Sequence, residues 1–165
     1  MQTYYVFSTM PKLKKTATAT AKSSKKQKLE EPELTEFEKK IVLIQYGKEN
    51  DLEGAEDLLA EYLKFMQIKI GQQDTSDKKC APSKKIDEMW HAHILSTKEY
   101  FAFCDRHNEG EYIHHDPSMT DVPARYNLTW KKYFELFGSS PKNLSIWPQC
   151  EGLRFEELES DGYGD

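Results

Sequence analysis

The residues best suited to chemistry are an aspartate and two histidines within the segment 86–95. Asp87 and His91 are four residues apart, so on a helix their side chains would share one face. His91 and His93 would lie about 200° apart at about 100° per residue, so one ion cannot easily bind both from a regular helix. Asp87 and His91 are therefore a candidate pair of ligands for a single metal ion.

A third ligand must come from another segment, and the obvious donor is the stretch His114-His115-Asp116, with its two adjacent histidines. Two imidazoles with one carboxylate form a ligand set that zinc, iron(II) and manganese accept. A rival set of His93, Cys104 and a loop histidine is nearly excluded, because a continuous helix would separate its first two members by about 16 Å. The candidate metal ligands are thus Asp87, His91, His114 and His115.

The same side chains also have a simpler, purely structural interpretation. His93 lies on an apolar stripe, where a histidine is most often a buried residue with a hydrogen-bond partner. Asp87 and His91 could form a surface pair that anchors the loop carrying His114 and His115. No G-x-S-x-G motif, no cysteine–histidine motif and no phosphate-binding glycine loop points to another kind of catalytic site.

The elements that must position these residues are helices. Apolar residues recur at helical spacing in four segments, and strand signals are weak. In the first segment the apolar stripe consists of Leu34, Phe37, Ile41 and Ile44. The strongest segment begins after Ser83, a suitable N-cap, and as one helix would extend roughly 36 Å. The predicted fold is all-α, a small bundle of about four helices over residues 34–46, 51–71, 84–107 and 124–137, with Asp51 as the cap of the second.

The chain is expected to comprise one domain between two polar tails. Residues 1–32 are rich in Lys, Thr, Ser and Ala with almost nothing to bury, which predicts a disordered basic tail. Its lysine clusters at 12–15 and 25–28 resemble a bipartite nuclear import signal, although a solubilising tail is the simpler interpretation. Residues 33–150 are expected to form the helical domain with an irregular C-terminal segment, and residues 151–165 an acidic tail.

Composition restricts where the protein works and what it binds. The three cysteines show no C-x-x-C spacing, which favours a reducing compartment. No apolar run approaches the roughly 20 residues that cross a bilayer, and no secretory signal is evident. We therefore expect a soluble, cytoplasmic or nuclear protein without a membrane partner. Its folded part is acidic, so nucleic acid would bind only weakly, through the Lys-rich tail.

Motifs in the central region resemble those of a known family. The string D-x-x-W-H-x-H from Asp87 to His93 is followed by H-H-D-P from His114 to Pro117, and further matches are Tyr100, Cys104, Tyr126, Thr129, Tyr133, Phe137, Gly138, Trp147 and Pro148. Over about residues 34–148 this combination resembles the plant and fungal glycine-rich domain-containing protein-like family, which has bacterial relatives. The resemblance implies a helical domain without an established activity. Plant members are linked to stress responses and carry long additional regions, including a glycine-rich tail, that this sequence does not contain.

Two functions remain open from the sequence. The first is a non-enzymatic interaction domain with an unidentified protein partner and no cofactor, in which the histidines latch the loop 108–118 onto the helix 84–107. The second is a domain that binds one zinc or iron ion through Asp87, His91 and either His114 or His115, with hydrolase or oxygenase activity. The first is favoured, because three ligands without recognised supporting residues are thin support for a metal site. Convergence of the ligands in the folded protein would separate the two.

Overall fold

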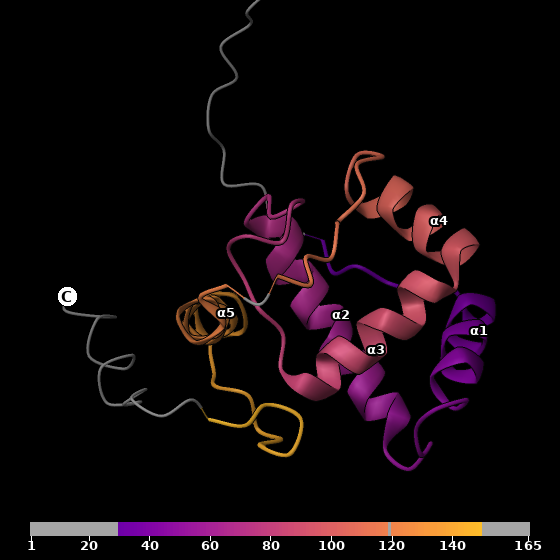
Figure 1. Ribbon diagram of the computed structural model, residues 1–165, viewed down its shortest axis with the longest axis horizontal. Helices are drawn as coiled ribbons and strands as arrows, with labels where there is room; N and C mark the ends of the chain where they lie inside the picture. The colour runs from indigo at the N-terminus through magenta and orange to yellow at the C-terminus, as the bar shows by residue number, and fades with distance from the viewer. Residues whose placement is uncertain (1–29, 119, 150–165) are drawn as a thin grey trace, which may run out of the picture.

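The computed structural model describes residues 30–118 and 120–149. These residues form five α-helices and no strand, which confirms the predicted all-α fold (Figure 1): α1 (Glu36–Tyr46), α2 (Ala55–Gly71), α3 (Lys84–Leu95), α4 (Thr97–His107) and α5 (Val122–Phe137). Within the described residues, no helix is long and apolar enough to span a bilayer. The predicted tails lie almost entirely outside the described residues, so the division at residues 32 and 150 stays a prediction.

Helix α1 begins at a capping box and is clamped to α4. The Thr35 hydroxyl accepts a hydrogen bond from the Glu38 amide at 3.2 Å, and the Glu38 carboxylate accepts one from the Thr35 amide at 2.8 Å. The two Glu38 oxygens also accept hydrogen bonds of 2.8 and 2.7 Å from the Arg106 guanidinium on α4. This bidentate pair joins the first helix to the fourth across the face of α3.

The predicted apolar stripe of α1 is wrong in part, although the helix itself is confirmed. Leu34, just before the helix, is buried as predicted. Phe37 and Ile44 are exposed, whereas Val42 and Tyr46 are buried in the core. Periodicity finds a helix, but the neighbouring helices select which of its apolar residues are covered. Here α3 and α4 pack on the side of α1 that carries the buried Glu38 and Val42.

Helix α2 begins later than predicted. Asp51 is not its cap: the Asp51 carboxylate accepts a hydrogen bond from the Glu53 amide at 3.0 Å, inside the preceding turn. The N-cap is Gly54, whose φ of 72° lies in the left-handed region that glycine adopts without strain. From Ala55 onward the predicted apolar stripe is confirmed, since its buried members include Leu58, Leu59, Tyr62 and Met66.

The predicted single helix over residues 84–107 is broken at Ser96. Ser83 caps its first half as predicted, with its hydroxyl accepting a hydrogen bond from the Ile86 amide at 3.2 Å. Ser96 leaves the helical conformation at ψ 61°, and its hydroxyl turns back to donate to the Ala92 carbonyl at 3.0 Å. The chain then restarts as α4. Because of this break Tyr100 lies back against α3, where its hydroxyl accepts a hydrogen bond from the Trp90 indole at 3.1 Å.

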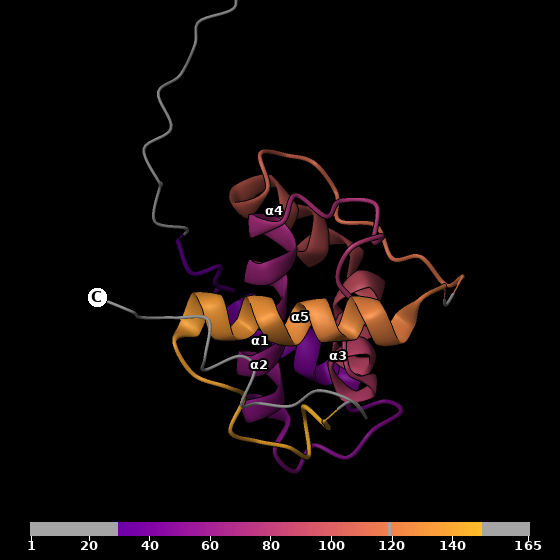
Figure 2. The ribbon, with the colours of Figure 1, turned by 90° about the vertical axis from the view of Figure 1, so that its left-hand side faces the viewer.

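The fifth helix completes the core from the other side of α2 (Figures 1 and 2). It starts at Val122, two residues before the prediction, and ends as predicted at Gly138, whose φ is 70°. The irregular segment that follows packs back onto the helices. Its Trp147 is fully buried and donates a hydrogen bond of 2.8 Å from the indole to Glu61 on α2. Trp90, Trp130 and Trp147 thus anchor the core from α3, α5 and the C-terminal segment.

His93 is the buried core histidine that the sequence predicts. Its Nδ1 lies 2.8 Å from the Tyr62 hydroxyl, and its ring contacts Tyr100 and Phe103. Burial lowers the pKa of His93 from 6.5 to about 4, because the imidazolium would lose its hydration there. The imidazole is therefore neutral in the folded protein at pH 7.

This burial predicts a loss of stability in mild acid. Between pH 6.5 and about 4 the unfolded chain binds a proton at His93 that the folded chain does not. The contribution of neutral His93 to the free energy of unfolding is fully present above pH 6.5. It should decline by about 3 kcal/mol as the pH falls to 4. Urea unfolding of metal-free protein at pH 7.5 and 4.5 measures it, with His93→Gln as the comparison. An equal pH dependence in both proteins would contradict the assignment.

Candidate metal site

Two of the candidate ligands project from α3 and a third comes from the loop 108–121. Asp87 and His91 share one face of α3, as their spacing predicts, and their side chains are 32% and 52% exposed. His115 lies across from them with a side chain that is 20% exposed. The group is therefore at the surface and open to solvent on the His91 side.

Three hydrogen bonds from different parts of the molecule hold the segment that carries His115. The Tyr100 hydroxyl donates to the Ile113 carbonyl, and the His114 amide donates to the Thr75 carbonyl at 2.7 Å. The Asp116 amide donates to the Asp77 carboxylate at 2.9 Å. The Lys78 ammonium also pairs with the Asp116 carboxylate. A segment without helical hydrogen bonds of its own is thus placed against α3 by its neighbours.

The donor atoms of the three residues converge. The Nε2 atom of His115 lies 2.8 Å from Oδ1 of Asp87 and 3.1 Å from Nε2 of His91. Nε2 of His91 lies 3.7 Å from Oδ2 of Asp87. One ligand atom from each residue lies within 4.8 Å of the others, and among the described residues this is the one such group of three.

Nε2 of His115 lies at distances from the other two residues that suit ligands of one small divalent ion. Bonds of about 2.0–2.1 Å at tetrahedral angles place two ligand atoms about 3.3 Å apart, which is close to the 2.8 and 3.1 Å measured to Oδ1 of Asp87 and Nε2 of His91. The 3.7 Å contact of His91 is to the other carboxylate oxygen of Asp87, Oδ2. Hydrogen bonding accounts for the group less well. A ring nitrogen offers either one hydrogen or one lone pair, yet Nε2 of His115 lies close to both Asp87 and His91.

The structure also distinguishes between the candidate metal ligands, which sequence spacing alone could not do. The His114 side chain is exposed and lies outside the converging group. His93 points into the core, and its Nδ1 is occupied by Tyr62. The His115 ring packs on Trp90, with 4.8 Å between the ring centroids, so the core side of α3 restrains one ligand directly. Of the four candidate ligands, Asp87, His91 and His115 come together.

Sequence reasoning missed a buried ionic network that supports this loop. Lys69 is fully buried near the end of α2, and its ammonium contacts Asp74 at 2.7 Å and Asp77 at 2.6 Å. Arg125 of α5 donates a further 2.7 Å hydrogen bond to Asp77. The two aspartates lie in the stretch 72–83, which the sequence predicts only as a polar loop. A lysine on the apolar side of α2, five and eight residues before these two acids, was the available signal.

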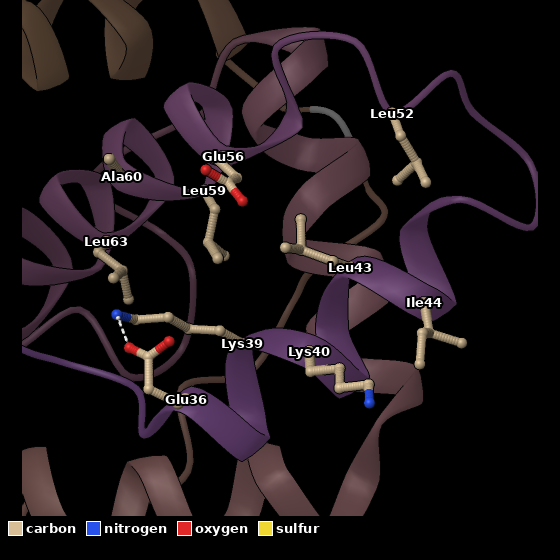
Figure 3. A pocket seen from close by; sticks show the side chains of 10 residues that line it. All are labelled: Glu36, Lys39, Lys40, Leu43, Ile44, Leu52, Glu56, Leu59, Ala60 and Leu63. Carbon is tan, nitrogen blue, oxygen red and sulfur yellow. Dashed lines mark hydrogen bonds and ion pairs between the residues drawn. The ribbon is translucent and has the colours of Figure 1, made fainter.

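Among the hollows on the described surface, one adjoins the ligand group and a larger one lies apart from it. One, of about 270 Å³, adjoins the ligand group, because Asp87 and His115 form part of its wall; the wall also includes Ala81, Pro82, Ser83, Lys84, Val122 and Arg125. The other, of about 570 Å³, is a mainly apolar groove between α1 and α2 (Figure 3). It contains the Lys39–Glu36 ion pair of 2.7 Å and shares no residue with the ligand group. The smaller hollow is therefore the one that could admit a molecule to the site.

Comparison with known protein families places the chain in one of them. The model of the UCP032817-like family matches residues 24–141, which include all five helices and all of the ligand group. The chain belongs to the UCP032817-like family. The resemblance to glycine-rich domain-containing proteins was wrong: the shared motifs are short, whereas the family match runs through most of the chain. No curated protein and no solved structure matches it. Because the family is uncharacterised, membership supplies no activity, and function must be argued from the site.

Proposed function

We propose that this protein is a metal-binding domain that holds one zinc or iron(II) ion through Asp87, His91 and His115. The observation that carries the proposal is the convergence of one carboxylate and two imidazole nitrogens within 4.8 Å. Nitrogen and carboxylate ligands suit zinc, and two histidines with one carboxylate also suit non-haem iron(II).

The proposed site has the character of a reactive rather than a closed structural centre. Three protein ligands leave at least one position for water or a substrate, whereas structural zinc sites use four protein ligands. His91 is half-exposed, and the hollow of about 270 Å³ lies against Asp87 and His115. Such an ion would support hydrolysis as zinc or oxygen chemistry as iron(II), and the open position is what both reactions require.

A latch without an ion is the second candidate function, and one contact favours it. The His115 ring nitrogen lies 2.8 Å from the Asp87 carboxylate, a distance at which a hydrogen bond alone would fasten the loop to α3. In that case the domain would act through its surface as an interaction module with a protein partner. The latch gives no role to His91, because its side chain is half-exposed and water can satisfy its ring nitrogens.

Zinc binding should stabilise the wild-type protein and fail in one variant. After chelator treatment, Zn²⁺ at about 100 times its Kd should stabilise the fold by about 2.7 kcal/mol, which shifts the Tm by several degrees. His91→Ala should abolish this shift and stoichiometric zinc, while it changes metal-free stability by only about 0.5 kcal/mol. His114→Ala is the matched control, since it removes an exposed imidazole from the same loop. Absence of any zinc-dependent shift in the wild type would leave only the latch.

Zinc binding should also weaken in acid. Both imidazoles must be neutral to bind an ion, so protons compete with zinc for the ring nitrogens. The zinc affinity should therefore fall as the solution is made acidic. Calorimetric titrations between pH 5.5 and 8 measure this dependence. An affinity unchanged over that range would show that histidines do not bind the ion.

A further inference from the structure

The segment that carries His115 depends on a buried residue that does not itself reach the ligand group. The Asp116 amide, which directly follows His115, donates a hydrogen bond of 2.9 Å to Oδ2 of Asp77. On the other side of His115, the His114 amide donates to the Thr75 carbonyl. Asp77 therefore holds the backbone on the C-terminal side of His115, and it does so through a side chain.

Asp77 is itself held on both sides. It is 2% exposed, and its Oδ1 accepts hydrogen bonds from Lys69 at 2.6 Å and from Arg125 at 2.7 Å. Arg125 also donates to the Asp77 backbone carbonyl at 2.7 Å. The backbone of Asp77 adopts the left-handed conformation with φ 53°. A non-glycine residue rarely adopts this conformation unless its surroundings impose it. Both carboxylate oxygens are thus fixed relative to α2 and α5.

We propose that Asp77 is a positioning residue that sets the ion affinity of the Asp87–His91–His115 group. This inference rests on the proposed function of that group. Asp77 holds the backbone next to His115 before an ion arrives, so binding does not have to order the loop. Residues that orient ligands in this way typically contribute about 10–100-fold in metal affinity.

The substitution Asp77→Asn tests this with the smallest change of shape. An asparagine has one oxygen, so one of its two sides must present an NH₂ group to a donor. If the oxygen stays with Lys69 and Arg125, the NH₂ group faces the Asp116 amide and that hydrogen bond is lost. The opposite orientation places NH₂ against two cations, so the first is favoured.

Asp74→Asn is the matched control. Asp74 is equally buried and contacts the same Lys69 ammonium, at 2.7 Å. Its carboxylate also accepts hydrogen bonds from the amides of Lys78, Lys79 and Cys80, and none of these bonds reaches the segment 111–118. Both variants remove one carboxylate from the network, but only Asp77→Asn removes a contact to the His115 segment.

The measurement is Co²⁺ affinity, with the visible absorption spectrum of the bound ion, well below the Tm of each protein. We expect Asp77→Asn to bind Co²⁺ about 10–100-fold more weakly with an altered spectrum, and Asp74→Asn to stay within about threefold of wild type. Equal losses in both variants, or wild-type affinity in Asp77→Asn, would overturn the positioning role and leave the ion site intact. A wild-type protein that binds no ion would overturn the proposed function and this inference together.

A second measurement needs no variant and remains available if Asp77→Asn does not fold. In metal-free wild-type protein, hydrogen exchange by NMR should show a protected Asp116 amide, because its bond to Asp77 exists before an ion binds. Fast exchange of this amide without metal, followed by protection when Zn²⁺ is added, would overturn the inference. It would show that the ion orders the loop and that Asp77 does not position it in advance.

Discussion

Replacing Lys69 with alanine is expected to destabilise the fold by about 3–5 kcal/mol. The substitution leaves the carboxylates of Asp74 and Asp77, each 2% exposed, without the ammonium that contacts both. Arg125 can compensate only at Asp77. The uncompensated charge of Asp74 would remain in a site from which water is excluded, and this dominates the loss. Urea unfolding at pH 7 in the presence of a chelator measures the effect apart from any ion.

Two further variants separate charge from volume. Lys69→Met keeps most of the side-chain volume and should cost nearly as much as alanine, because the carboxylates remain unpaired. Lys39→Ala removes a lysine from a partly exposed ion pair with Glu36 and should cost less than about 1 kcal/mol. If Lys69→Met were as stable as the wild type, the ion pairs of Lys69 with Asp74 and Asp77 would not stabilise the fold.

Trp90→Ala should have an effect of similar size, about 3–5 kcal/mol, because it empties the centre of the core. Trp90 is fully buried and packs against Phe65, and its indole donates to the Tyr100 hydroxyl at 3.1 Å. The Lys69 ammonium lies 5.1 Å from the centroid of the Trp90 ring, and the His115 ring also packs on Trp90. One substitution would thus remove support from the core, the ionic network and the ligand group.

Thermal and urea unfolding of the Trp90 variant should show the loss directly. Leu95→Ala, an exposed position on the same helix, should change stability by no more than about 0.5 kcal/mol and serves as the control. Trp90→Phe should lie between the two, since it keeps part of the ring packing but not the hydrogen bond to Tyr100. A Trp90→Ala protein with an unchanged Tm would mean that the indole is not in the core.

Local sequence determined most of the helices and two of the three members of the ligand group. Helical periodicity depends on residues three and four positions apart, so it located α2 and α5 to within a few residues, and α1 likewise. The same rule placed Asp87 and His91 on one face, because both belong to one continuous helix. The burial of Trp90 and His93 followed in the same way, since both lie on the apolar face of that helix.

The other features needed the tertiary structure, because each depends on partners distant in the sequence. His115 and not His114 joins the group, since Thr75, Asp77 and Tyr100 fix the orientation of a segment that has no periodicity of its own. A lysine is rarely fully buried, and only the folding of Asp74 and Asp77 around Lys69 makes its burial tolerable. A serine is compatible both with the interior of a helix and with its end. In the folded protein α3 ends at Ser96, and Tyr100 of the next helix packs against Trp90. Sequence periodicity depends on residues within about one helical turn of each other. The choice of His115, the burial of Lys69 and the break at Ser96 depend on contacts between distant segments.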